Sequence, residues 1–422
     1  MLTGKLCVGN RYVRAKDHKT YAMGTVLIVT MFAVWGICHR LYDTILPAFI
    51  SALSLTHFQV SLAYCVTLLA YCLVAIPSAF FLRNFGYKAG VVGGLGCFAV
   101  AMFMFFPAET QHSYLFFLCA GLLANCGVAL LEIAADPWIM RLGSADTAIR
   151  RLNIAQTFNP LGLLIGIFLG ERLISSTASQ SAQVPFLPYI LVGASLLLCA
   201  YLIDRVHFSP EATKRVSKDD RTIDDLKRVL AMSEFRLGVG ALALYIVGHT
   251  VLWGFAERYA QSVMPATSGA AVADIGLWTL YAFVIGRFVG TGLMYRFRPE
   301  NLLIVFSAAS VALTAAASFA RGWPGIWCVV GASFFMSILF PTIFGMAVRS
   351  VGKSMKSASA LLIMAGGTAT ASLPIMNLIC GSAVIPYVVL LPSLCFILIT
   401  AFAVMHRKMP AETSAQIAVV LT

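Results

Sequence analysis

The chain has 422 residues, of which 59% are hydrophobic and 11% are charged. A charge content this low excludes a soluble globular domain and indicates a polytopic membrane protein. The formal net charge is +12, but most Lys and Arg residues lie in the tails and in alternate loops, which is the positive-inside pattern of membrane proteins. We therefore expect membrane lipids, and no nucleic acid, around this chain.

Twelve apolar stretches can cross a bilayer as helices, since a span needs about 20 apolar residues. The first twenty residues are polar and basic and run directly into the first span, so we expect no cleavable signal. With this tail inside the cell, an even number of spans places both termini in the cytoplasm, and we expect a multi-pass protein of the inner membrane. The predicted spans are 21–49, 58–82, 89–106, 114–140, 152–175, 185–203, 237–260, 275–296, 302–320, 324–348, 358–380 and 384–405.

The longest polar segment divides the spans into two sets of six, and the loops of the two halves resemble each other. LRNFGYKAG follows the second span, and MYRFRPENLL follows the eighth. Two six-helix repeats are typical of secondary transporters, so the sequence predicts an all-α membrane protein with twelve transmembrane helices in two six-helix bundles. The predicted parts are a tail at 1–20, a bundle at 21–205, a linker at 206–236, a bundle at 237–405 and a tail at 406–422.

Two acids lie inside the apolar fourth span. An ionisable side chain at this depth costs at least ~2.5 kcal/mol, so its default interpretation is a functional site. Glu132 and Asp136 are four residues apart and share one helix face. Neighbouring carboxyl groups do not both ionise easily in a low dielectric, which suits a proton carrier. An alternative for Asp136, which precedes Pro137, is a structural hydrogen bond to the backbone or to a cytoplasmic Arg.

The first span carries a second group of ionisable residues. His39, Arg40 and Asp43 are three or four residues apart, so they can share a helix face. Protonation of Asp43 would break an ion pair with Arg40 and free the guanidinium to bind an anion. The alternative is a permanent structural pair of Arg40 with Asp43 or Glu132.

Later spans contribute further candidates for substrate binding. The fifth span carries Asn153, Gln156 and Asn159, whose amides both donate and accept hydrogen bonds. The eleven cysteines show neither CxxC spacing nor accompanying His pairs, so we expect no metal site.

The seventh and eighth spans carry His249, Trp253 and Arg287. An imidazole near the centre of a span can carry a proton or bind substrate, and a satisfied interior histidine is the alternative. Trp253 and Tyr64 are candidates for stacking on a sugar ring, although most aromatic side chains of such a chain face lipid or fill the bundle. Arg287 either bridges to a neighbouring helix or binds substrate.

Several strings together identify a family that this chain resembles. They are YDTILPAF in the first span, AIPSAFFLRNFGYKAG after the second, LEIAADP and RRLNIAQTFNPLG around the fourth and fifth, GRFVGTGLMYRF in the eighth and ILFPTIFGMAV in the tenth. In this order and spacing they resemble the fucose/proton symporter family of the major facilitator superfamily. The resemblance implies alternating access that couples proton entry to sugar uptake.

The resemblance also implies roles for single residues. Asp43 and Glu132 match acids linked to proton and substrate binding, and Gln156 and Asn159 match amides that face the cavity. Where family members commonly carry amides, this sequence has His39, Arg40, Tyr64, Asp136 and His249, which puts a simple neutral sugar in doubt.

We therefore expect a proton-coupled symporter that imports a sugar or sugar derivative, including acidic or amino sugars. The alternative is a proton-coupled exporter of a small polar or anionic metabolite. An enzyme is not expected, because no nucleophile is paired with a base. We expect a monomer with no cofactor, in which protons are the coupling ion.

Overall fold

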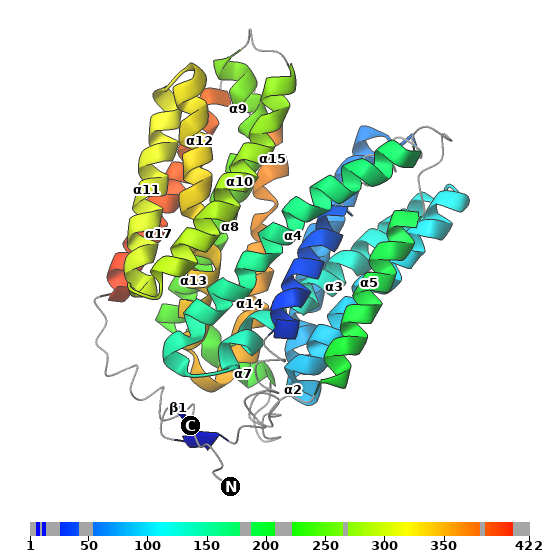
Figure 1. Cartoon of the computed structure of the whole chain (residues 1–422), viewed down its shortest axis with the longest axis vertical. Helices are drawn as coiled ribbons and strands as arrows, with labels where there is room; N and C mark the ends of the chain where they lie inside the picture. Colours follow the sequence, from blue (N-terminus) through cyan, green and yellow to red (C-terminus); the bar gives the residue numbers. More distant parts are fainter. Residues whose placement is uncertain are drawn as a thin grey trace. The chain divides into compact units, whose positions relative to one another are not determined.

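The structure is a computed structural model that describes residues 6–8, 11–13, 26–41, 54–177, 187–206, 222–264, 269–379 and 385–407 (Figure 1). At a few helical positions within these ranges, Tyr64 among them, only the backbone is described. The chain groups into two compact units. The N-terminal unit comprises Met1–Arg151 and Leu161–Asp225, and the C-terminal unit comprises Leu152–Pro160 and Leu226–Thr422.

The N-terminal unit consists mainly of long helices, with one small antiparallel hairpin in which Cys7 pairs with Tyr12. Within this unit α2 packs against α3 and α5. Its elements are β1 (Leu6–Val8), β2 (Arg11–Val13), the helix Val26–Leu41, α2 (His57–Thr110), α3 (Tyr114–Arg141), the 3-10 turn η1 (Ala145–Thr147), most of α4 (Ala148–Thr177), α5 (Leu187–Arg205) and the start of α7 (Thr222–Ala231).

The described residues of the C-terminal unit form helices joined by short turns, with no strand among them. Here α8 packs against α13, α14 and α17, α10 packs against α12, and α11 packs against α12 and α17. Its elements are α8 (Ser233–Gly254), α9 (Ala256–Val263), α10 (Gly269–Leu293), α11 (Pro299–Phe319), α12 (Gly322–Met336), α13 (Leu339–Arg349), η2 (Gly352–Ser354), α14 (Met355–Ala369), α15 (Ser372–Ile379), α16 (Ile385–Val388) and α17 (Leu390–Arg407).

Among the described residues, ten helices are long and apolar enough to cross a membrane. One of them, Leu69–Thr110, covers most of two predicted spans, and the shorter apolar helix Val26–Leu41 covers part of the first. Each of the twelve predicted spans therefore contains helix, and the prediction of an all-α membrane protein is confirmed. The predicted tails and linker stay predictions, because much of 1–20, 206–236 and 406–422 lies outside the described residues.

The basic stretch between the second and third spans is not a loop. It is a one-residue break inside α2, where Gly86 has φ 87° and ψ 173°, a conformation that only glycine adopts readily. On either side of the break, Arg83 donates to Thr222 at 3.4 Å, and Lys88 Nζ lies 3.3 Å from Asp204 Oδ1. The sequence predicted a loop after the second span, but helix continues on both sides of Gly86, and the two cations bond to other parts of their own unit.

Three predicted spans of the C-terminal unit are interrupted helices. α8 gives way to α9 at Phe255, α12 to α13 at Ser337 and Ile338, and α14 to α15 at Thr370 and Ala371. The backbone keeps right-handed dihedral angles at these positions, for example φ −58° and ψ −39° at Ser337 and φ −62° and ψ −20° at Thr370, so only the hydrogen-bond ladder is interrupted. Interrupted helices are also typical of substrate sites in transporters, so these breaks direct attention to the residues beside them.

Glycines allow close helix contact at two points of the N-terminal unit. A Cβ on Gly94 of α2 would lie 2.8 Å from the carbonyl oxygen of Gly127 in α3. A Cβ on Gly162 of α4 would lie 2.2 Å from the carbonyl oxygen of Ala33 in the first helix. Small residues at such crossings let membrane helices pack backbone to backbone, and these contacts fix α3 and the first helix, which carry the predicted ionisable residues.

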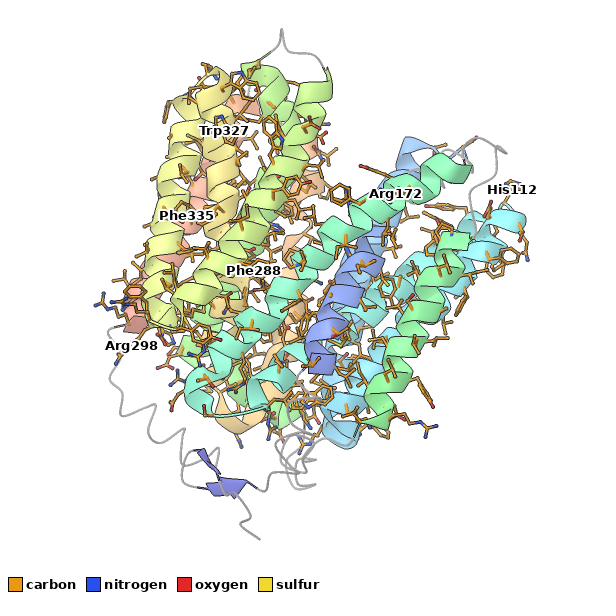
Figure 2. All side chains as sticks on the ribbon, in the orientation of Figure 1. His112, Arg172, Phe288, Arg298, Trp327 and Phe335 are labelled. Carbon is orange, nitrogen blue, oxygen red and sulfur yellow. The ribbon has the colours of Figure 1, made fainter. Side chains whose placement is uncertain are left out.

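The outer surfaces of the helices are apolar, as lipid contact requires. Figure 2 labels Phe288, Phe335 and Trp327 along the helices of the C-terminal unit, and Phe288 and Trp327 are 49% and 57% exposed. The labelled arginines lie near helix ends: Arg172 is in the last turns of α4, and Arg298 immediately precedes α11. This distribution fits helices whose flanks face hydrocarbon and whose ends face the lipid headgroups.

Candidate functional site

The two acids predicted in the fourth span both lie in α3. Asp136 is fully buried and Glu132 is half-buried, and their carboxyl groups interact electrostatically. Tyr71 of α2 lies within electrostatic range of Glu132. The N-terminal unit therefore brings the predicted acids together, next to a phenol that the sequence analysis did not single out.

The end of α3 is held in place by one arginine. Arg151 donates hydrogen bonds to the carbonyl oxygens of Ile139 at 3.3 Å, of Met140 and, at 2.9 Å, of Ser144. It also donates to the hydroxyl of Thr147. The last carbonyls of a helix have no partner within the helix, so Arg151 caps α3 and joins it to the start of α4, one turn beyond Asp136.

His39 and Arg40 lie at the end of the described part of the first helix, Val26–Leu41, and both side chains are half-buried. A Cβ on Gly166 of α4 would lie 2.9 Å from the Cβ of Arg40, so the close approach of α4 fixes the base of this side chain. Asp43 lies outside the described residues. It therefore stays a prediction that Asp43 lies beside His39 and Arg40. Whether Arg40 forms a switchable or a permanent ion pair stays a prediction as well.

The amides predicted in the fifth span lie in the middle of α4, in the segment that groups with the C-terminal unit. Asn153 and Gln156 are buried and Asn159 is half-buried. Asn153 Nδ2 donates to Thr342 Oγ1 of α13 at 3.3 Å. One turn further along α4, the hydroxyls of Thr157 and Thr291 of α10 lie 3.3 Å apart, so polar contacts join this segment to two helices of its unit.

Aromatic side chains gather around His249. Tyr245, His249 and Trp253 are spaced by four residues and share one face of α8. The Tyr245 ring stacks on the imidazole with centroids 5.6 Å apart, and the Trp253 ring lies 4.5 Å away. Phe283 of α10 lies 6.0 Å from the imidazole and meets Trp253 edge to face at 5.1 Å. We call His249, Trp253 and Phe283 the aromatic cluster.

Two polar atoms indicate that the aromatic cluster is a candidate binding site and not only a packed core. Trp253 Nε1 donates to Ser333 Oγ of α12 at 3.2 Å. Nε2 of His249 is buried and has no hydrogen-bond partner within the part of the chain that the structure describes. The side chains of His249 and Trp253 are half-buried, whereas Phe283 is 5% exposed. A buried nitrogen without a partner is costly, which favours a site where a ligand or water supplies the missing bond.

Arg287 lies one turn after Phe283 on α10 and is 4% exposed. Its guanidinium carbon lies 5.1 Å from the centroid of the Phe283 ring, a cation–π contact. Its charge also interacts with Tyr245 and His249. Arg287 therefore lies next to the aromatic cluster, in contact with Phe283. Both a structural and a substrate-binding role for this residue stay predictions.

Several residues of these groups were missed in the sequence. Tyr245 could have been found, because it precedes His249 by the same four residues that separate His249 from Trp253. Phe283, Ser333 and Tyr71 carry no local signal, since phenylalanine, serine and tyrosine are common in membrane helices. The side chain of Tyr64, which the sequence analysis did single out, lies outside the described part of α2.

In the ranges that the structure describes, no three His, Cys, Asp or Glu residues lie close enough to hold a metal ion. Ionisable and aromatic groups buried in membrane helices are instead the features of a secondary transporter. Comparison with known proteins supports this class. The sequence profile of the Major Facilitator Superfamily matches residues 23–374.

Individual relatives match along nearly the whole chain. The L-fucose-proton symporter of Escherichia coli (strain K12) is 31% identical over 415 residues, which cover 92% of this chain and 94% of that one. The glucose/galactose transporter of Brucella abortus biovar 1 (strain 9-941) is 27% identical over 411 residues, with 94% and 97% covered. A crystal structure of the major facilitator superfamily transporter FucP, in the outward conformation, superposes with a TM-score of 0.86 at 30% identity and covers 92% of this chain and 100% of that one.

The chain therefore belongs to the major facilitator superfamily and, within it, to the fucose/proton symporter family. It is a transporter and not an enzyme. The resemblance found in the sequence motifs is confirmed. The comparisons do not assign roles to the residues described above, so those roles are proposals.

Proposed function

We propose that this chain is a symporter that uses the proton gradient to import a sugar or sugar derivative by alternating access. The observation that carries the proposal is the carboxyl pair of α3, half-buried Glu132 and fully buried Asp136, in a chain related over its length to an L-fucose-proton symporter. Acids at membrane depth are expensive to keep and are typical of proton relays. The glucose/galactose transporter of Brucella abortus is a second sugar transporter among the relatives.

Protons bind to the acids of the N-terminal unit. Glu132 is the primary carrier, because it is the half-buried member of its pair, and fully buried Asp136 shares the proton with it. Asp43 is the third carboxyl of the coupling site, and its protonation releases Arg40. Loading a proton removes a charge from the membrane interior, which lowers the cost of the change between outward-facing and inward-facing states.

The sugar binds to polar and aromatic groups of the C-terminal unit. The amides Gln156 and Asn159 of α4 both donate and accept hydrogen bonds, as sugar hydroxyls require. His249 supplies a further hydrogen bond through Nε2, and Trp253 stacks on the apolar face of the ring. The proposal is supported by the unpartnered Nε2 and by the half-buried surface of both side chains.

Among sugars, an acidic one fits this chain better than an amino sugar. Arg287 is a buried cation beside the aromatic cluster, and Arg40 and His39 are basic groups on the first helix. A cation in a low dielectric attracts a carboxylate and repels an ammonium group. We therefore extend the proposal to hexuronates as preferred substrates, with neutral hexoses and 6-deoxyhexoses as weaker ones.

The remaining expectations concern the whole protein. We propose a monomer in the inner membrane with both termini in the cytoplasm and no cofactor other than the coupling proton. The orientation is supported by basic loops after the fourth and tenth spans, which carry Arg141, Arg150 and Arg151 in one half and Arg349 and Lys356 in the other.

Uptake into proteoliposomes tests the proposal. Purified protein is reconstituted, an inward proton gradient is imposed, and accumulation of labelled hexoses, 6-deoxyhexoses, hexuronates and amino sugars is measured with and without a protonophore. We expect gradient-dependent accumulation of at least one sugar, and stronger accumulation of a hexuronate than of its neutral counterpart. Outward, gradient-driven depletion of preloaded substrate would support the exporter instead, and transport insensitive to the protonophore would exclude proton coupling.

A further inference from the structure

The indole of Trp253 donates a hydrogen bond to a neighbouring helix, and this bond holds the ring in place. Trp253 lies in the last turn of α8, just before the break at Phe255. Its Nε1 donates to Ser333 Oγ at 3.2 Å. Ser333 is fully buried, and its own hydroxyl donates to the carbonyl oxygen of Val329 at 3.1 Å. Because that bond uses the hydroxyl proton, the oxygen lone pairs face Trp253, and Ser333 can act only as an acceptor there.

The position of Ser333 is fixed by close packing of α12 on α10. A Cβ on Gly286 would lie 2.2 Å from the carbonyl oxygen of Phe334, the residue after Ser333. The two backbones therefore touch beside the serine. Phe283, one turn before Gly286 on α10, lies 5.1 Å from the Trp253 ring, with the ring planes inclined at 71°. Trp253 and Phe283 thus form two walls of a corner, with His249 4.5 Å from the indole.

We infer that Ser333 is a positioning residue for sugar recognition and that Phe283 forms the second wall of the same subsite. The inference rests on the proposed function. In this subsite the C–H face of a pyranose stacks on the indole of Trp253, and an apolar edge of the sugar ring packs against Phe283. One sugar hydroxyl forms a hydrogen bond with His249 Nε2. Substrates with a continuous C–H face are the class it fits.

The role of Ser333 follows from what an indole needs in a membrane protein. An indole is a large apolar ring with one polar atom, and when it is buried that atom usually finds a partner. A ring locked in its binding orientation loses less conformational freedom when substrate arrives, so a fixed ring binds more tightly than a mobile one. Loss of the serine hydroxyl should therefore weaken substrate binding and leave the rate of the transport cycle nearly unchanged.

The kinetic test compares variants in proteoliposomes with the sugar that the wild-type protein transports. Ser333→Ala should raise KM about three- to tenfold, as expected for one lost hydrogen bond, with a maximal rate within about twofold. Ser333→Thr keeps the hydroxyl and should retain wild-type KM. Ser310→Ala is the matched control, because Ser310 is equally buried but bonds only the carbonyl oxygen of Phe306 in its own helix.

A double-substitution cycle separates positioning from general stability. In a Trp253→Phe background, Ser333→Ala should change KM no further, since the bond is already absent. An added loss in that background would overturn the inference, and so would an unchanged KM for Ser333→Ala alone. If the wild-type protein transports no sugar, the proposed function fails instead, so the two failures are distinguishable.

A spectroscopic arm covers the case in which Ser333→Ala does not fold. ¹⁵N-tryptophan labelling gives indole N–H resonances, and the one lost in Trp253→Phe belongs to Trp253. Ser333→Cys, which has nearly the same size and a weaker acceptor, should move this resonance upfield, whereas Ser333→Thr should leave it in place. A resonance that does not respond to Ser333→Cys contradicts the hydrogen-bonded arrangement.

Discussion

At position 132 a carboxyl group is kept inside an apolar helix, four residues from a second carboxyl group that is fully buried. Carboxyl groups are costly to bury and persist at membrane depth mainly where they have a function. We therefore assign the proton-carrying role first to Glu132, the half-buried member, which can exchange protons more readily than Asp136.

This assignment predicts the behaviour of Glu132→Gln. The amide has nearly the same shape but carries no titratable proton, so proton-driven accumulation should be lost, while exchange of labelled for unlabelled substrate across the membrane stays within about threefold of the wild-type rate. Glu171→Gln is the control, since Glu171 is an exposed acid near the end of α4. Retained accumulation in Glu132→Gln would show that another group carries the proton.

Asp136 requires its own test, because a structural bond beside Pro137 also explains a buried acid. We expect Asp136→Asn to lower accumulation at least about tenfold, which corresponds to ~1.4 kcal/mol, with an unchanged thermal midpoint. The isosteric amide preserves the shape of the site but holds no exchangeable acid. Normal accumulation combined with a lowered midpoint would mean that Asp136 is structural.

The two kinds of candidate residue differ in how far the sequence could predict them. Glu132 and Asp136 were predictable, because an acid stands out in an apolar span. His249 and Trp253 were found by the same contrast, but Phe283 and Ser333 were not, since neither residue type is unusual in a membrane helix. Their role depends on the crossing of α10 and α12, which depends on contact between residues far apart in the chain.

At the scale of the element, α4 makes two different kinds of helix contact. Asn153 and Thr157 contact helices of the C-terminal unit. After Pro160, Gly162 lets α4 approach the first helix, because a Cβ on this glycine would collide with the carbonyl oxygen of Ala33. The fifth span therefore makes polar contacts in the segment before Pro160 and a small-residue contact in the segment after it.

This arrangement predicts that Gly162→Ala destabilises the protein. The added Cβ would lie 2.2 Å from the carbonyl oxygen of Ala33, so the helices must separate. Over-packing of this kind costs typically ~1–3 kcal/mol, and the thermal midpoint of the detergent-solubilised protein should fall. Gly96→Ala is the matched control, because its Cβ meets nothing within 4 Å. Equal midpoints for the two variants would contradict the close crossing.

The element scale also shows what an apolar pattern cannot predict. The positions of the spans followed from hydropathy, because about 20 apolar residues are needed to cross the bilayer. The breaks at Ser337 and Thr370 carry a different signal, because they lie four residues before Pro341 and Pro374, and a proline removes the helical hydrogen bond to the residue four positions earlier. The break at Phe255 has no proline in the turn after it and did not follow from the sequence. Conversely, the cations around Gly86 predicted a loop where α2 continues on both sides of a single glycine.

At the scale of the whole molecule, the N-terminal unit holds the buried acids and the C-terminal unit holds the aromatic cluster. The proposed mechanism assigns proton binding to one unit and sugar stacking to the other. Coupling then requires that each ligand favour the same change of state, since a ligand shifts an equilibrium only by its differential affinity for the two states. Proton-coupled symport therefore requires that sugar and proton cross the membrane together.

The most direct measurement is a pH record from proteoliposomes that contain a pH-sensitive dye, with potassium and valinomycin to hold the membrane potential at zero. Addition of the transported sugar outside should acidify the lumen of liposomes with wild-type protein, and the signal should be absent with Glu132→Gln although this variant still exchanges substrate. Sugar entry without acidification in the wild-type protein would contradict proton-coupled symport.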